Sequence, residues 1–203
     1  MMAKFIVLEG SEGVGKSTNL ALIADILAAH GDVVQTREPG GTPLAESIRQ
    51  LLLSKQEDAP VPLAELLLMF AARAQHIEKK IKPALAQGQW VLCDRFTGST
   101  RAYQGFGREM GLQAIDQLAE LVHSDCQPDL VIYLDAPVEV GLQRAGQRSQ
   151  PDRFESEKLE FFNKVRQGYL AQAETDPSWW VIDASQPLAK VQSDLRTKLE
   201  DWL

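Results

Sequence analysis

Five short apolar runs, separated by longer stretches of helical periodicity, constrain the fold of this chain more than any other feature. Continuous apolar runs of this length suit strands that are covered on both faces, as in a parallel sheet. The alternation of such strands with helices predicts an α/β fold with a doubly wound, parallel, five-stranded sheet flanked by helices. The runs are 5–8, 33–34, 90–93, 130–134 and 179–182, and the helical stretches are 17–30, 43–53, 64–80, 112–123, 138–146, 155–173 and 188–203.

The length of 203 residues indicates a single domain spanning 1–203. The net charge of -7 provides no general attraction for nucleic acid or an anionic membrane, so neither is an expected partner. The longest apolar run, 66–72, is far shorter than the ~20 residues of a membrane span. The two cysteines, Cys93 and Cys126, form neither a disulfide framework nor a metal-ligand spacing. We therefore expect a cytoplasmic protein with two inert, buried thiols.

A glycine-rich loop follows the first apolar run. Residues 10–17 read G-x-x-x-x-G-K-S, directly after a predicted strand and at the start of a predicted helix, which is the context that this phosphate-binding motif needs. Glycines let backbone N–H groups approach phosphate oxygens, and the helix N-terminus adds a partial positive charge. The lysine reaches the β- and γ-phosphates, and the serine hydroxyl ligates Mg²⁺. The loop predicts a nucleoside triphosphate site with Mg²⁺ as cofactor, made by Gly10, Ser11, Glu12, Gly13, Val14, Gly15, Lys16, Ser17 and Thr18.

Signals outside this loop favour a small anionic acceptor for the phosphoryl group. The chain has neither the N-K-x-D motif of a switch GTPase nor the His-Arg-Asp and Asp-Phe-Gly motifs of a protein kinase. Arg37 and Arg95 instead follow the second and third apolar runs, beside loop signals. Guanidinium groups bind phosphate through two parallel hydrogen bonds, so these arginines predict a second anionic site beside the first. Arg49 and Arg73 are further candidates for that site.

Four further motifs give the chain a family resemblance. They are Thr36-Arg37-Glu38-Pro39-Gly40-Gly41-Thr42, Asp94-Arg95-Phe96 with Ser99, Ala102-Tyr103-Gln104-Gly105 and Asp152-Arg153-Phe154-Glu155. With the phosphate loop, they make the chain similar to bacterial thymidylate kinases, which are P-loop nucleoside monophosphate kinases, from residue 4 to about residue 200. The resemblance implies a sheet of the P-loop NTP hydrolase type with a short lid, and a homodimer. It also implies transfer of the γ-phosphoryl group of ATP to dTMP, giving dTDP and ADP.

The resemblance implies which side chains hold dTMP. Those expected around its phosphate are Arg37, Arg49, Arg95 and Gln104. Arg73 and Thr100 would lie at the thymine edge. Family members often have a phenylalanine four residues before the arginine that corresponds to Arg73, and its ring stacks on the thymine. This chain has Met69 at that position and Phe70 next to it. Both positions lie near the helical face of the arginine, so we expect Phe70 to cover the base, with Met69 as the alternative.

Other side chains are expected around the sugar and the metal ion. By the resemblance, Glu12 would approach the 3′-hydroxyl, and Tyr103 would crowd the 2′ position and disfavour a ribonucleotide. The peptide bond before Pro39 is often cis in the family. Asp94, at the end of the third run, is a candidate to assist Mg²⁺ or to position acceptor groups, so the expected metal ligands are Ser17 and Asp94.

Charge neutralisation is the expected catalytic strategy. The second pKa of a phosphate monoester is ~6, so the acceptor oxygen is already an anion at neutral pH and needs no general base. Lys16 and Arg95 would supply opposing charge. Residues 141–153 form the candidate lid, with several glycines and arginines. Because no arginine occupies the variable positions of the phosphate loop, the lid must supply the catalytic guanidinium, which we expect from Arg153 first and Arg148 second.

Two other functions remain compatible with the phosphate loop. A kinase of another small anionic acceptor would not need Arg73 for its choice of acceptor. A regulatory or assembly ATPase without a small-molecule acceptor would hydrolyse ATP in the absence of any monophosphate.

Overall fold

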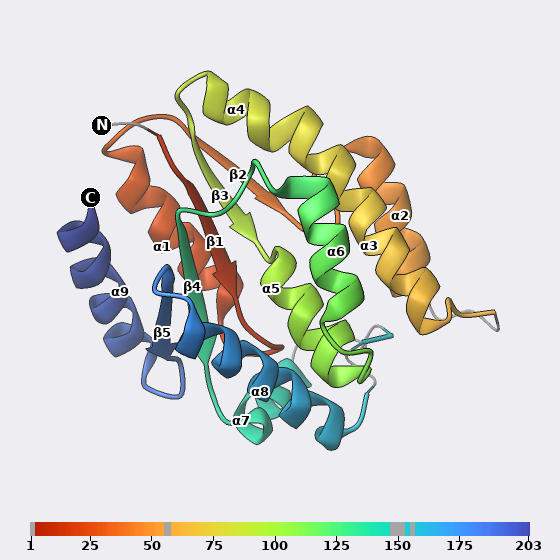
Figure 1. Cartoon of the computed structure of the whole chain (residues 1–203). Helices are drawn as coiled ribbons and strands as arrows, with labels where there is room; N and C mark the ends of the chain where they lie inside the picture. Colours follow the sequence, from red (N-terminus) through yellow and green to blue (C-terminus); the bar gives the residue numbers. More distant parts are fainter. Residues whose placement is uncertain (1–2, 55–57, 147–152, 155–156) are drawn as a thin grey trace.

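A five-stranded parallel sheet with the strand order β2-β3-β1-β4-β5 forms the centre of the structure (Figure 1). The structure is a computed structural model that describes residues 3–54, 58–146, 153–154 and 157–203. The strands are β1 (Phe5–Glu9), β2 (Val33–Arg37), β3 (Trp90–Asp94), β4 (Leu130–Asp135) and β5 (Trp179–Asp183). The α-helices are α1 (Lys16–Ala28), α2 (Pro43–Leu53), α3 (Pro62–His76), α4 (Lys82–Ala86), α5 (Thr97–Thr100), α6 (Gln113–His123), α7 (Val138–Ala145), α8 (Leu159–Thr175) and α9 (Leu188–Trp202), and the π-helical segments are η1 (Ile77–Ile81) and η2 (Arg101–Gly107).

Helices cover both faces of the sheet, and the central strand is buried on each. Ile6 and Leu8 of β1 pack in one apolar cluster with α1 and α9, whereas Phe5 and Val7 pack on the opposite face with residues of η1 and α4. Figure 1 shows α1 and α9 on one side of the sheet and α3, α4 and α6 on the other. The predicted fold class, a parallel sheet between two helical layers, is confirmed.

The register of the strands brings their carboxyl ends to one edge of the sheet. Leu8 of β1 and Arg37 of β2 both pair with Asp94 of β3. The residues that follow these strands therefore lie close together, although they are far apart in the sequence. In an open parallel sheet this edge is where ligands bind.

Helix boundaries agree best with the sequence where a capping signal marks them. The predicted helix 43–53 is found as α2, and the hydroxyl of Thr42 accepts a hydrogen bond from the backbone N–H of Ala45 at its start. The predicted helix 64–80 is found as α3, which continues through the wider π-helical turn of η1 into α4, where Pro83 lies. Proline lacks an N–H and its ring clashes with the preceding turn, and a π-helical turn relieves that clash.

Both cysteines lie in the interior of the protein. Cys93 and Cys126 are free and buried, and burial raises the pKa of both thiols, that of Cys126 to about 11. In the part of the chain that the structure describes, none of the helices combines the length and the apolar character of a bilayer span.

Candidate active site

A cavity of about 310 Å³ opens at the carboxyl edge of the sheet. The phosphate loop lines one part of it. The rest is lined by the end of β2 and the segment after it, α2, α3, the end of β3 and the turn after it, α5, η2 and Phe154. The cavity thus joins the two anionic sites that the sequence predicts. The predicted residues that line it are Glu12, Gly13, Val14, Gly15, Lys16, Ser17, Arg37, Pro39, Arg49, Arg73, Asp94, Arg95, Thr100, Tyr103 and Gln104.

The phosphate loop holds its lysine through backbone carbonyl groups. Lys16 begins α1, and its Nζ donates hydrogen bonds to the carbonyl oxygens of Gly10, at 3.1 Å, and Ser11, at 3.3 Å. These two residues and Thr18 do not line the cavity themselves. Burial lowers the pKa of Lys16, and the positive charge of Arg95 lowers it further. A bound anion would offset both effects.

The loop also rests directly on the backbone of α7. Gly13 has φ +72, and a Cβ atom at this position would lie 1.8 Å from the carbonyl oxygen of Gly141. Any side chain at position 13 would therefore collide with α7. Close packing of the two backbones fixes the height of the loop above the sheet.

Arg95 connects the phosphate loop to the acceptor side of the cavity. Its Nη2 donates to Glu12 Oε1 at 2.6 Å and its Nη1 to the Tyr169 hydroxyl at 3.0 Å, while the Tyr103 hydroxyl donates to the same Glu12 oxygen at 3.1 Å. Burial raises the pKa of Glu12, but Arg95 and Lys16 outweigh this effect and hold that pKa below its ordinary value. Glu12 is thus a carboxylate held between two cations at the centre of the cavity.

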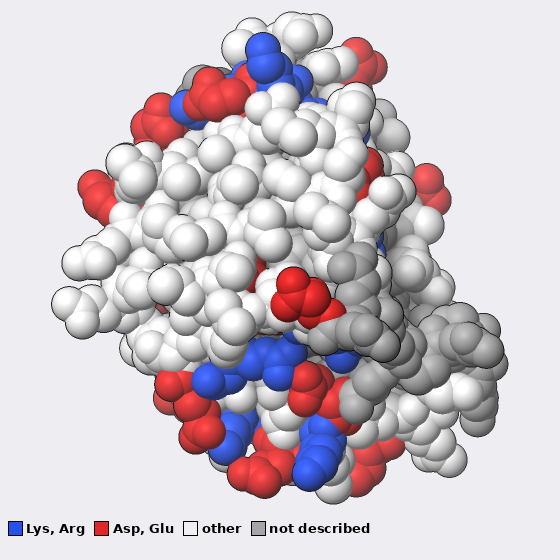
Figure 2. All heavy atoms as spheres, turned by 90° about the vertical axis from the view of Figure 1, so that its right-hand side faces the viewer, with Lys and Arg blue, Asp and Glu red and all other residues white. Residues whose placement is uncertain are grey.

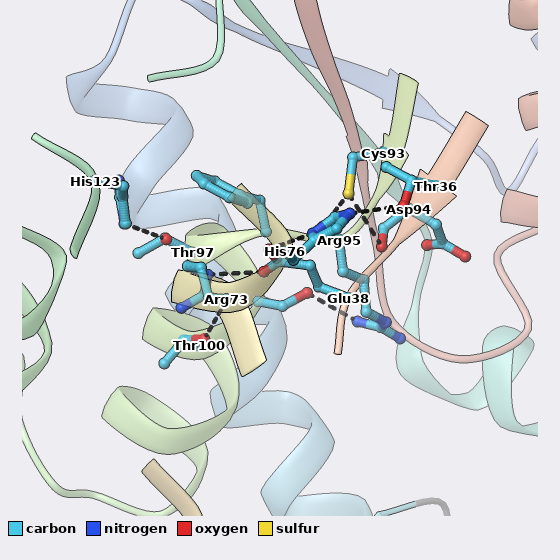
Figure 3. Close-up of polar contacts among 12 residues, drawn as sticks. Thr36, Glu38, Arg73, His76, Cys93, Asp94, Arg95, Thr97, Thr100 and His123 are labelled. Carbon is cyan, nitrogen blue, oxygen red and sulfur yellow. Dashed lines mark hydrogen bonds and ion pairs between the residues drawn. The ribbon is translucent and has the colours of Figure 1, made fainter. Parts of the chain in front are cut away.

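Arg73 is a buried residue of the cavity wall, and one of its donor nitrogens, Nη1, is unused (Figure 3). Its Nε donates to Glu38 Oε2 at 2.7 Å, and its Nη2 donates to Thr100 Oγ1 at 3.0 Å. Its Nη1 is buried and has no hydrogen-bond partner among the described residues, although the side chain is only 3% exposed. A buried donor without a partner is costly, and a carbonyl oxygen on a ligand would satisfy it.

Arg37 and Arg49 line the cavity on the side of the segment that follows β2. Arg37 is half exposed and forms an ion pair with Glu46 at 2.7 Å. Arg49 donates from Nη1 to the carbonyl oxygen of Pro39 at 3.0 Å. The Glu38–Pro39 peptide bond is cis, as the resemblance implied. The end of β2 and α2 therefore each present one guanidinium group at the cavity wall.

The residues at the phosphate loop fit a magnesium ion carried by a triphosphate. Asp94 and Ser17 both line the cavity, and Asp94 Oδ1 is buried without a hydrogen-bond partner among the described residues. Within those residues, no group of three or more His, Cys, Asp or Glu side chains is gathered to hold a metal ion. Mg²⁺ commonly uses only one or two protein oxygens together with phosphate oxygens and water. The donor set is therefore suited to Mg²⁺.

The structure distinguishes the two candidates for covering the base. Met69 lines the cavity, whereas Phe70 does not. Phe70 is 2% exposed, packs with Leu66 and residues of α6, and stacks on the ring of His123 at a centroid distance of 6.4 Å. Successive residues of a helix point about 100° apart, so only one of the two side chains can face the cavity. This placement differs from our expectation for Phe70 and agrees with the alternative, Met69.

The structure does not bring Arg153, the first of the expected lid arginines, to the cavity. Arg153 does not line it, since its Nε donates to the carbonyl oxygen of Leu52 at 2.9 Å and its Nη2 donates to Glu65 Oε2 at 2.5 Å. Arg148 lies outside the described residues, as do all of residues 147–152 of the predicted lid 141–153.

Two buried side chains next to the cavity were missed in the sequence. Glu65 is 1% exposed and accepts a hydrogen bond from Gln104 Nε2 at 2.7 Å in addition to that from Arg153. His76 is fully buried and contacts Glu38. The available signal was helical spacing, because His76 follows Arg73 by three residues, which is about one turn.

The comparisons with known proteins cover nearly the whole chain. Residues 8–195 match the family model described as thymidylate kinase. A thymidylate kinase of Teredinibacter turnerae is 54% identical over all of this chain and all of its own length, and one of Pseudomonas fluorescens is 55% identical over all of this chain and 98% of its own. The crystal structure of thymidylate kinase from Ehrlichia chaffeensis superposes with a TM-score of 0.80 at 35% identity, covering 98% of this chain and 100% of that one.

The family match, the full-length similarity and the shared architecture agree with the cavity described above. The chain therefore belongs to the thymidylate kinase family.

Proposed function

We propose that this protein transfers the γ-phosphoryl group of ATP to dTMP, giving dTDP and ADP. The observation that carries the proposal is that one cavity is lined both by the phosphate loop and by a second group of arginines. One of these, Arg73, has a buried donor nitrogen without a partner among the described residues. A regulatory ATPase has no need of the second group. The names of the relatives support dTMP as the acceptor.

The acceptor phosphate is best placed between the phosphate loop and the segment after β2. Arg37, Arg49 and Arg95 line this part of the cavity. Arg95 is already oriented, because it binds Glu12 and Tyr169 at the same time. A guanidinium that is already oriented loses little conformational freedom when it binds phosphate.

The thymine is best placed against Arg73. The unused Nη1–H would donate to a carbonyl oxygen of the base, with Thr100 and Gln104 beside it and Met69 as the cover. A thioether is polarisable and adapts to a flat aromatic surface, so Met69 suits this position. The sugar would then lie near Glu12 and Tyr103, which agrees with their expected roles at the 3′-hydroxyl and the 2′ position.

The reaction requires positioning more than acid–base chemistry. The acceptor oxygen is already ionised at neutral pH, so no side chain has to remove a proton. Lys16 and Arg95 both place positive charge near Glu12, where the two substrates would meet. Fixed charges in a site that excludes water stabilise the transferring phosphoryl group without reorganising.

Mg²⁺ is the proposed cofactor, with Ser17 and Asp94 as the residues that would hold it. When bound, it neutralises phosphate charge and orients the triphosphate.

We also propose a cytoplasmic location, because free thiols such as those of Cys93 and Cys126 persist in a reducing compartment.

The proposed function is tested by measuring ADP release from ATP with dTMP, dUMP, dCMP, dAMP or dGMP, and without an acceptor. We expect the highest kcat/KM with dTMP and almost no ADP without an acceptor, because the cavity is built for two anions. Equal rates with and without acceptor would favour the regulatory ATPase. A preference for a base other than thymine would favour the kinase of another acceptor.

The two-substrate arrangement predicts an unequal effect of Arg95→Ala. We expect the KM for dTMP to rise by about 10- to 100-fold, because charge-assisted hydrogen bonds to the phosphate are lost. The KM for ATP should change by less than about threefold. Arg196→Ala, which removes an exposed arginine of α9, is the control and should change neither value. Equal losses for both substrates would contradict the assignment of Arg95 to the acceptor.

The proposed catalytic role of Arg153 requires its guanidinium group to leave Glu65 and to bind the transferring phosphoryl group. In the structure it binds Glu65, which also holds Gln104 of the acceptor pocket. Glu65 is buried, so removal of Arg153 leaves a buried carboxylate with fewer donors. Loss of the arginine should therefore affect stability as well as turnover, and the two effects must be separated.

We predict that Arg153→Ala lowers kcat by at least ~100-fold with little change in the KM for ATP, because the transferring group loses a cation. Thermal unfolding of the same variant measures its loss of stability, and kcat is compared at a temperature where the variant is fully folded. Near-normal kcat together with a lower melting temperature would restrict Arg153 to a structural role.

We propose that the protein is a homodimer through the face formed by α2, α3 and α6. Figure 2 shows that this face carries few charges over a wide area and that charged residues gather above and below it. Leucine and valine side chains are exposed along these helices, as on an interface rather than on a free surface. They are Leu44, Leu51, Val61, Leu63, Leu67 and Leu121.

The homodimer is tested by light scattering after size exclusion. We expect the unmodified protein to have twice the mass of one chain, and Leu67→Glu to shift it toward one chain mass, because a buried charge opposes association. Leu188→Glu on α9 is the matched control, since Leu188 is 49% exposed and Leu67 is 50% exposed. A single-chain mass for the unmodified protein would contradict the proposal.

A further inference from the structure

A chain of four hydrogen-bonded side chains leads from the end of β2 to the cavity (Figure 3). The Thr36 hydroxyl lies 2.7 Å from His76 Nε2, and His76 Nδ1 lies 3.0 Å from Glu38 Oε1. The other Glu38 oxygen binds Arg73 Nε at 2.7 Å. Of these four residues, Arg73 and Glu38 line the cavity, whereas His76 does not.

We propose that His76 is a positioning residue for acceptor recognition. It fixes the carboxylate of Glu38, and through that carboxylate it aims the unused N–H of Arg73 at the base. The inference rests on the proposed placement of the thymine beside Arg73. It adds a residue that touches no substrate but sets which base the cavity accepts.

The first step of the argument is the geometry of Arg73. A guanidinium group is planar, so two fixed N–H groups determine the direction of the remaining ones. Glu38 fixes Nε and Thr100 fixes Nη2, which leaves Nη1 with a single direction. Loss of either partner would let the plane of the group rotate.

The second step concerns Glu38, which is 4% exposed. A carboxylate bound through one oxygen can turn about its last side-chain bond, whereas one bound through both oxygens cannot. Burial raises the pKa of Glu38, but Arg73 and the hydrogen bond from His76 outweigh it and hold that pKa below the ordinary value of 4.5. Glu38 is therefore a carboxylate, and His76 occupies the oxygen that Arg73 leaves free.

The third step is that His76 itself cannot move. Its side chain is 0% exposed, and both ring nitrogens have partners. A carboxylate only accepts, so Nδ1 carries the proton that it donates to Glu38, and Nε2 shares a hydrogen bond with the Thr36 hydroxyl. The ring also fills the space beside Gly41, where a Cβ atom would lie 2.5 Å from it. The segment after β2 therefore clamps the ring against α3.

The helix geometry supports a special role for this position. The α-helical pattern of α3 ends at His76, and η1 begins with the next residue. Single π-helical turns of this kind often accompany functional positions, because they re-aim the side chains around them.

The inference is tested with His76→Leu and His76→Gln. Leucine fills the space without a hydrogen bond, whereas the glutamine amide can donate to Glu38 and accept from Thr36. For His76→Leu we expect the KM for dTMP to rise about tenfold or more, with kcat and the KM for ATP within about twofold of the unmodified protein. His76→Gln should recover most of this loss.

A second measurement separates the orientation of the Arg73 N–H from the stability of the protein. Thymine has a carbonyl oxygen where cytosine has an amino group, so a correctly aimed N–H favours dTMP over dCMP. We expect the ratio of kcat/KM for dTMP over dCMP to fall about tenfold or more in His76→Leu and to recover in His76→Gln. If His76→Leu does not fold, Thr36→Val removes the outer hydrogen bond from a partly exposed side chain and should shift the same ratio in the same direction.

His123→Leu is the matched control. His123 is 2% exposed and has a contact of the same kind and length, 2.7 Å to the Thr97 hydroxyl, but it does not bind Glu38. It should lose stability and keep the dTMP to dCMP ratio. Equal effects of His76→Leu and His123→Leu on that ratio, or no recovery in His76→Gln, would overturn the inference.

Arg73→Ala tests the premise independently. If Arg73→Ala leaves the ratio unchanged, the placement of the base is wrong and the inference falls with it. If Arg73→Ala lowers the ratio and neither His76→Leu nor Thr36→Val does, the placement of the base stands and His76 has no positioning role.

Discussion

The arrangement of the site depends on the buried carboxylate of Glu9 at the end of the central strand. Its Oε1 accepts hydrogen bonds from the backbone N–H groups of Phe96, at 2.9 Å, and Ser99, at 3.0 Å, and its Oε2 accepts one from the Tyr169 hydroxyl at 3.2 Å. These contacts bind the beginning of α5 and one side of α8 to the carboxyl end of the sheet. Burial raises the pKa of Glu9, and the hydrogen bonds offset part of that effect. Arg95 lies in the turn that Glu9 holds, with φ 67, a backbone conformation that a non-glycine residue adopts only where its surroundings enforce it.

Other carboxylates of the site also hold arginines in place. The chain has a net charge of -7, yet basic side chains outnumber acidic ones in the lining of the cavity. An arginine that is already paired needs less ordering when a phosphate arrives, which favours tight and selective binding. The buried Arg73–Glu38 pair is also sensitive to removal of one partner, since the other is then left uncompensated. The pairs are Arg37–Glu46, Arg73–Glu38, Arg95–Glu12 and Arg153–Glu65.

The sheet and the phosphate loop could be predicted from the sequence because both are encoded locally. An apolar run predicts a buried strand by itself, and the spacing of Gly10 to Ser17 places the loop between β1 and α1. The helical segment formed by α5 and η2 could not be predicted, because its glycine, serine and threonine residues have low helix propensity and tertiary contacts, such as those with Glu9 and His123, hold its start. The choice between Met69 and Phe70, and the partners of Arg153, depend on how α3 is rotated against α6 and on which carboxylate lies nearby. Such tertiary contacts leave no local pattern in the sequence.

The close packing of Gly13 on Gly141 gives α7 a mechanical role. Because the loop is in close contact with the carbonyl oxygen of Gly141, it cannot move toward α7, and its backbone N–H groups keep one position relative to the sheet. A polyphosphate chain would therefore meet donors that are already in place. Two residues without side chains, more than a hundred positions apart in the chain, thus provide the firm support that an in-line transfer requires.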